Sequence, residues 1–223
     1  MNAIFFDSST LISLAEAAAL DILPALKEAF GGQLAITTTV KEETIDKAMV
    51  TDRFMYEGVR LRKMLDAGTL TLFGDGHVAE LSEKISSLVN NTFFVGKKPL
   101  KIIHAGEVSV LAVSLQQNCE AIAIDERTMR LVIEDPNSLR QLLESKLHIK
   151  LNINKQNLLS WQDIIKKKVT VIRSTELAIA AWRKGLLAGT DEKALRGILW
   201  ALKFAGCAIS TDEINTYIKR LVK

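Results

Sequence analysis

Short apolar runs alternate with longer amphipathic stretches along the first 134 residues of the chain. The first run, Ala3 to Phe6, contains no polar position and stops at Asp7, as is typical of a strand that is buried on both faces. Three hydroxyl residues follow, Ser8 to Thr10, and apolar residues then recur with helical spacing. The pattern predicts a strand, a polar turn and a helix, with Asp7 at the carboxyl end of the strand.

Similar strands are predicted at residues 34–38, 68–73 and 121–124, each followed by a helical pattern. The longest predicted helix covers residues 44–67, and a last strand is expected within 148–153. Alternation of strands and helices indicates a mostly parallel sheet with helices on both faces. We therefore predict an α/β protein with a three-layer α/β/α architecture and a mostly parallel central sheet.

The pattern changes near residue 154, after which apolar residues recur with helical spacing in three segments. We predict two regions, an α/β domain at 1–153 and an all-helical C-terminal region at 154–223. The second region has a basic bias, carried by Lys155, Lys166, Lys167, Lys168, Arg173, Arg183, Lys184, Lys193, Arg196 and Lys203.

The overall charge is small, because 29 Lys and Arg stand against 26 Asp and Glu, for a formal net charge of +3. This charge does not by itself indicate nucleic-acid binding, but it is compatible with it because the basic residues gather in the C-terminal region. Cys119 and Cys207 are far apart and have no CxxC motif, which argues against a zinc site or a disulfide scaffold. No apolar run reaches the roughly 18 residues of a membrane span. We expect a cytoplasmic protein without a membrane partner.

Four acidic residues occupy equivalent positions in the predicted fold. Asp7 and Asp125 each end an apolar strand, whereas Glu43 and Glu107 each open a helix that follows a strand. In a doubly wound sheet, all four positions face one crevice at the carboxyl ends of the strands. The sequence therefore predicts a cluster of carboxylates there.

Each acid also has a local structural explanation. Asp is a favoured helix cap, so Asp7 could serve only to begin a helix. The helix dipole favours an acid in a first turn, which would account for Glu107. Thr39 and Glu42 have the spacing of a capping box, which leaves Glu43 without such an explanation.

Carboxylates brought together repel one another unless a cation offsets their charge. Oxygen ligands without nearby His or Cys favour Mg²⁺ or Mn²⁺, which bind through a few carboxylates, water and substrate phosphates. The reaction class that follows is metal-assisted hydrolysis of a phosphodiester.

Four segments resemble the acidic motifs of the PIN domain family, in the same order: Ile4 to Ser9, Val40 to Glu43, Ala105 to Glu107 and Ile122 to Arg127. The resemblance covers about residues 1–150. It implies a Mg²⁺- or Mn²⁺-dependent ribonuclease fold in the first region. Many members of the family are toxins of prokaryotic toxin–antitoxin pairs, and the family usually dimerises, so the resemblance implies a homodimer and an antitoxin or ribonucleoprotein partner.

The resemblance also assigns roles to residues. Asp7, Glu43, Glu107 and Asp125 would be catalytic and would hold the metal. Many relatives have two aspartates after the last strand, where this chain has Asp125 and Glu126. Either could be the fourth ligand, and Asp125 is preferred because it directly ends the apolar run.

Candidate contacts with RNA lie both near these acids and away from them. Ser9 stands where many relatives have Asn or Ser near the site, and Arg127 follows the last acidic pair. Lys97 and Lys98 belong to a basic loop that would suit an anionic partner, although an ordinary surface loop is the alternative.

The C-terminal region lies outside the resemblance and suggests an additional role in RNA docking or partner binding. Trp182 and Trp200 lie among its basic residues, where they would either stack on unpaired bases or anchor the helical core. Our leading hypothesis is a metal-dependent endoribonuclease. The alternatives are a module that binds RNA or a ribonucleoprotein with little or no cleavage, and a helical adaptor that recruits another protein.

Overall fold

The computed structural model describes residues 1–165 and 169–222. Three of the basic residues noted in the C-terminal region, Lys166, Lys167 and Lys168, lie outside the described residues.

The main sheet has five parallel strands in the order β3-β2-β1-β6-β8. They are β1 (Ala3–Phe6), β2 (Gln33–Thr37), β3 (Leu70–Phe73), β6 (Ala121–Ala123) and β8 (Thr170–Ile172). β1 and β6 lie at the centre and every one of their residues is buried, which explains their uninterrupted apolar runs. The predicted α/β class and parallel sheet are confirmed.

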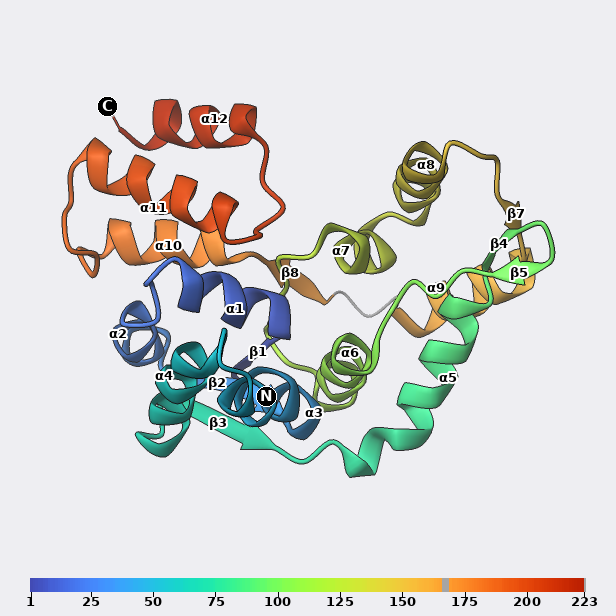
Figure 1. The fold of residues 1–223 in the computed structure, drawn as a ribbon, viewed down its shortest axis with the longest axis horizontal. Helices are drawn as coiled ribbons and strands as arrows, with labels where there is room; N and C mark the ends of the chain where they lie inside the picture. The colour runs from blue at the N-terminus through green and yellow to red at the C-terminus, as the bar shows by residue number, and fades with distance from the viewer. Residues whose placement is uncertain (166–168, 223) are drawn as a thin grey trace.

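Helices cover both faces of this sheet, which confirms the three-layer architecture (Figure 1). α6 (Ala105–Gln117) packs against β1, β2 and β6, and most of its residues are buried, so its sequence is apolar on nearly all sides. α1 (Ser8–Glu16), α2 (Ile22–Phe30) and α10 (Ser174–Arg183) pack together on the other side of the sheet.

The connection from β2 to β3 differs from the single long helix that the sequence predicts. The chain forms α3 (Thr38–Lys41), a π-helical turn η1 (Glu42–Asp46), a 3₁₀ turn η2 (Ala48–Val50) and only then α4 (Met55–Asp66). The predicted capping box of Thr39 and Glu42 is also absent, because the helix begins two residues earlier than this box requires. Thr37 caps it, and the Thr39 backbone N–H and hydroxyl both donate to Asp75 Oδ2.

Two excursions of the chain form an arm beside the main sheet, at the right of Figure 1. The first contains η3 (Gly76–Val78), α5 (Ala79–Asn90), β4 (Phe93–Val95) and β5 (Lys98–Pro99). The second contains α7 (Arg127–Glu134), α8 (Pro136–Leu147), β7 (Asn152–Ile153) and α9 (Lys155–Ile165). β7 pairs with β4, α9 contacts α5, and buried Trp161 donates through Nε1 to Thr92 Oγ1 at 3.0 Å. The expected last strand is thus shorter than predicted and belongs to this small sheet.

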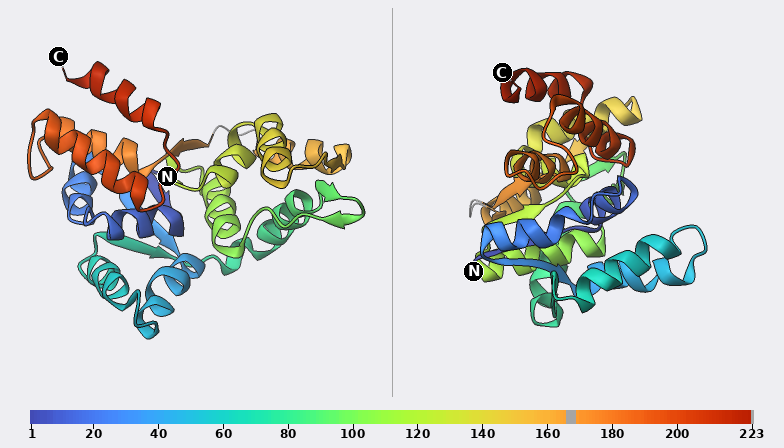
Figure 2. Two further views of the ribbon diagram at one scale, coloured as in Figure 1. Left: turned by 45° about the horizontal axis from the view of Figure 1, so that its top comes forward. Right: turned by 90° about the vertical axis from the view of Figure 1, so that its left-hand side faces the viewer.

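The chain ends in three helices, α10, α11 (Glu192–Phe204) and α12 (Thr211–Leu221), which Figure 2 shows packed above α1. β8 lies after residue 153 in the chain, and yet it extends the main sheet beside β6. The predicted division at residue 153 stays a prediction, but the expectation that residues 154–223 are all-helical is wrong, because β8 comes from this region and pairs with β6. Within residues 1–165 and 169–222, no helix combines the length and apolar character needed to cross a membrane.

Candidate active site

Asp7 follows β1 directly and is almost completely buried, with 2% of its surface exposed. Its Oδ2 atom accepts hydrogen bonds from the Ser9 backbone N–H at 3.1 Å and the Ser9 hydroxyl at 2.6 Å, which caps α1. Its Oδ1 atom is buried and has no hydrogen-bond partner among the described residues. Asp7 is therefore a helix cap with one oxygen and an available ligand with the other.

Ser9 joins the carboxyl ends of the two central strands. Its hydroxyl donates to Asp7 Oδ2 and accepts a hydrogen bond from the Asp125 backbone N–H at 3.1 Å. Both hydrogen bonds of the Ser9 hydroxyl are made within the protein, and they hold the Asp7 carboxylate in place.

Glu43 lies in the π-helical turn η1 and reaches toward α1 and α6. Its Oε2 atom accepts a hydrogen bond from the Ser8 hydroxyl at 2.6 Å. The same carboxylate lies against Gly106 at the start of α6, where a Cβ atom would overlap it. A larger side chain at residue 106 would displace the Glu43 carboxylate from this position.

Glu107 is held in the first turn of α6, where its Oε2 accepts from the His104 backbone N–H at 2.7 Å. Burial, and to a smaller extent the charges of Asp7, Glu126 and Glu43, raise the pKa of Glu107 to about 8 against the lowering effect of the His104 hydrogen bond. Burial also raises the pKa of Asp7, with a smaller contribution from Glu43. Asp7, Glu43, Glu107 and Glu126 are therefore near enough for their charges to affect one another.

Asp125 and Glu126 face different surroundings. Asp125 is fully buried and both its oxygens are used by Ser174, with Oδ1 accepting from the backbone N–H at 2.7 Å and Oδ2 from the hydroxyl at 2.6 Å. Glu126 caps α7 by accepting from the Met129 N–H at 2.7 Å, and its charge acts on Glu107. The surroundings of Glu126 suit a fourth ligand better than those of Asp125, which the apolar run had favoured.

The residues present suit a hard divalent cation in the kind of donor they supply. Carboxylate oxygens are the donors that such cations prefer, and the orphaned Oδ1 of Asp7 needs a positive partner to offset burial among other acids. Across the part of the chain that the structure describes, no three His, Cys, Asp or Glu side chains are already drawn together tightly enough to form a metal site.

A comparison with models of known families bears on the identity of this site. A model of the PIN domain matches residues 3–137, which include all the acids of the site. The chain belongs to the PIN domain family. PIN domains are generally nucleases. No curated protein and no solved structure matches the chain significantly.

The structure brings only one of the three predicted basic contacts to the acidic site of the PIN domain. Arg127 is the first residue of α7, is exposed and directly follows Glu126. Lys97 and Lys98 lie in the β4–β5 hairpin of the arm, away from β1 in Figure 1. The structure therefore does not bring these two lysines to the acids.

The sequence reasoning missed three residues that shape the PIN domain site. Ser8 and Gly106 lie inside the acidic motifs, next to Asp7 and Glu107, so their place near the site could have been predicted from the sequence. Ser174 gave no signal, because it lies 49 residues after Asp125 and outside every motif.

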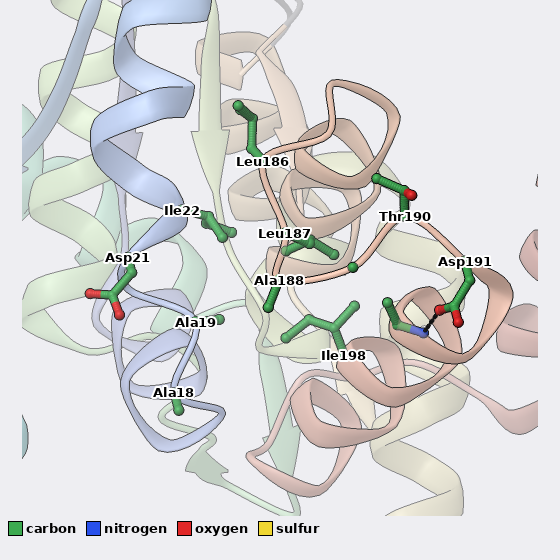
Figure 3. Close-up of a pocket in the computed structure, with 12 residues that line it drawn as sticks. Ala18, Ala19, Asp21, Ile22, Leu186, Leu187, Ala188, Thr190, Asp191 and Ile198 are labelled. Carbon is green, nitrogen blue, oxygen red and sulfur yellow. Dashed lines mark hydrogen bonds between the residues drawn. The ribbon is translucent and has the colours of Figure 1, made fainter.

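A separate cleft of about 690 Å³ lies between the end of α1 and the loop that joins α10 to α11 (Figure 3). Small and apolar side chains such as Ala19, Leu187 and Ile198 make most of its wall. Asp191 lies at its rim and caps α11 by accepting from the Ala194 N–H at 2.8 Å. The cleft holds no cluster of acids and is not part of the PIN domain site.

Proposed function

We propose that this PIN domain protein is an endoribonuclease that requires Mg²⁺ or Mn²⁺. The observation that supports this most is the buried Asp7, whose Oδ1 atom has no partner among the described residues and which shares its site with other carboxylates. Such an arrangement is unfavourable in the folded protein unless it serves to bind a cation.

In this proposal Asp7, Glu43, Glu107 and Glu126 hold the metal. A bound divalent ion would supply a hydroxide nucleophile from water and would stabilise the leaving oxygen. Asp125 shapes the site from behind, because its carboxylate ties the end of β6 to Ser174.

The chain's other groups position these acids. The Ser9 hydroxyl and backbone N–H fix Asp7, the Ser8 hydroxyl fixes Glu43, and the His104 N–H fixes Glu107. Arg127 stands beside the acids, where its guanidinium would bind a phosphate of the substrate. The expected homodimer, antitoxin or ribonucleoprotein partner and cytoplasmic location stay predictions.

Calorimetric titration with Mn²⁺ tests the metal, followed by incubation with a mixed RNA pool with and without chelator. Asp7→Asn should lose metal binding and lower cleavage by about 100-fold or more, because the ligand charge disappears. Asp135→Asn is the matched control, since Asp135 is also a helix cap: it begins α8 by accepting from the Asn137 N–H and from the N–H and hydroxyl of Ser138.

Cleavage that survives in a clean preparation of Asp7→Asn contradicts the proposal. A wild-type protein that binds RNA but does not cut it with either metal would instead support the module that binds RNA or a ribonucleoprotein.

A further inference from the structure

Two aromatic side chains stack on each other on α11, outside the part of the chain that the family model matches: Phe204 is exposed, whereas Trp200 is half-buried and packs against the hydrophobic core. Phe204 is 81% exposed, and its ring stacks on Trp200 with centroids 5.5 Å apart and planes at 28°. Lys203 Nζ lies 4.9 Å from the centroid of the Trp200 ring. These residues are three and four positions apart on the helix and therefore share one side of it.

A basic pocket of about 610 Å³ adjoins this pair and lies between α7, the end of α11 and the start of α12. Arg127, Arg130 and Lys203 line it, together with Arg173 and the segment 207–210. Lys203 belongs to both features, because its side chain lines the pocket and lies over the Trp200 ring.

Of the four cationic side chains that line this pocket, Arg127 and Lys203 have no ion-pair partner among the described residues, whereas Arg130 pairs with Glu134 and Arg173 pairs with Glu176 and Glu213. No carboxylate of the described residues lies within ion-pair distance of Arg127 or Lys203, and Lys203 Nζ donates instead to the Thr211 hydroxyl at 2.7 Å. Arg130 meets Glu134 only at 3.7 Å. The one carboxylate that lines the pocket, Glu213, is bound to Arg173 at 2.9 Å. The pocket therefore suits an anion.

The pocket is also next to the acids. Arg127 follows Glu126 in the chain, and the Ala208 backbone N–H at the pocket wall donates to the Asp125 carbonyl at 3.1 Å. A strand of nucleic acid with one phosphate at the acids would place its neighbouring phosphates at this pocket.

We propose that Trp200, Lys203 and Phe204, together with Arg127 and Arg130, bind the unpaired strand of the substrate next to the phosphate that is cut. A base stacks on the exposed face of Phe204, and the pocket receives a backbone phosphate. Aromatic faces combined with positive charge are the usual means of binding single strands, since every base offers a face for stacking. The inference rests on the proposed function, and it assigns substrate binding to the C-terminal helices.

Fluorescence anisotropy tests this surface, with a labelled single-stranded RNA of roughly ten nucleotides and the same sequence as a duplex. Chelator is present throughout, so that binding is measured without cleavage. We expect Phe204→Ala and Lys203→Gln each to weaken single-strand binding by about fivefold to tenfold. RNA should also quench the fluorescence of the wild type more than that of Trp200→Phe, which retains Trp161 and Trp182.

Matched controls are available on α4, in another part of the fold. Tyr56→Ala removes an aromatic ring that is 72% exposed, and Lys63→Gln removes an exposed positive charge. Neither should change binding, and thermal unfolding should confirm that all five variants are folded.

Three results would overturn the inference. The first is equal binding of RNA by the wild type, Phe204→Ala and Lys203→Gln, and the second is tighter binding of the duplex than of the single strand. The third is a change in the molecular mass of Phe204→Ala on light scattering with RNA binding unaltered, which would assign the surface to contact between two copies of the chain. Cleavage by the wild type is measured separately. If the wild type cuts RNA while its α11 variants bind RNA normally, this inference is wrong and the proposed function is unaffected.

Discussion

The carboxyl ends of β1 and β6 are alike in sequence and different in structure. Each strand is a short buried apolar run that ends at an aspartate. Asp7 keeps one oxygen without a partner, whereas Asp125 has both oxygens bound by Ser174. An acid that follows an apolar run in the sequence can therefore be placed at a strand end, but the sequence does not show whether its carboxylate is free to bind a ligand.

Hydrogen-bond donors explain this difference. A buried carboxylate is stabilised when N–H and O–H groups surround it, and it is costly when they do not. At β6 these donors come from the start of α10, and at β1 they satisfy one oxygen only. Asp125 thus stabilises the fold, whereas the burial of Asp7 lowers the stability of the fold and leaves one of its oxygen atoms available as a ligand.

The largest effect on stability should come from Asp125→Ala. The change leaves the Ser174 N–H and hydroxyl buried without an acceptor, so the free energy of unfolding should fall by about 3 kcal/mol. Urea unfolding measures this fall. Ser174→Ala should cost less, and the two changes together should cost less than their sum because they remove the same contacts. Additive losses would contradict the role given to this pair.

Titration of Glu107 should make the acidic site a source of instability as pH rises. Its pKa of about 8 in the folded protein lies above the ordinary value of 4.5, so the folded state binds the extra proton between these values. The free energy of unfolding should therefore fall with rising pH across this window, by at most about 1.4 kcal/mol per pH unit from this group.

Urea unfolding in chelator between pH 5 and pH 8 measures this slope, as roughly three units of pH within the window. Glu107→Gln should flatten it, since the amide has no proton to lose. A slope that is the same in both proteins would show that Glu107 is not responsible.

Glu126→Gln separates the two residues that follow the end of β6. Because Glu126 shares the site with Glu107, losing its charge should weaken Mn²⁺ binding about tenfold, equivalent to about 1.4 kcal/mol. Asp125→Asn should retain Mn²⁺ affinity more fully than Glu126→Gln. Calorimetry on both variants decides the question, and the opposite ranking would restore Asp125 as the ligand.

The smallest effect on stability is expected for Gly106→Ala. The new methyl group overlaps the Glu43 carboxylate, which lies at the end of a flexible side chain and can turn away. The free energy of unfolding should change by less than about 1 kcal/mol, because alanine favours the helix that follows. Metal binding and cleavage should fall together, and unchanged cleavage would show that Glu43 is not needed there.

The parts of the fold that could be predicted are those that local pattern determines. The apolar runs at β1 and β6 and the polar turn after β1 located the acids, since the ends of parallel strands share one edge of a sheet. The π-helical turn before α4 was not predictable, because the residues of 42–50 are compatible with a regular helix and tertiary packing selects the irregular form.

The choice between Asp125 and Glu126 as a metal ligand is a second feature that could not be predicted from the sequence. Both are acids next to the same strand, and the donors that distinguish them come from Ser174, far along the chain. The place of the basic loop is a third, because nothing local indicates that Lys97 and Lys98 stand on an arm that points away from β1. Contacts between distant segments carry this information.

The place of β8 in the sheet has a consequence for the protein while it is being made. Until residues 170–174 leave the ribosome, β6 is an edge strand with unpaired backbone groups, and Asp125 is buried without its donors. Domains fold as units from the N-terminus during synthesis, and here the unit cannot close until this late segment arrives. A growing chain therefore cannot complete the main sheet or satisfy the Asp125 carboxylate before this segment has been made.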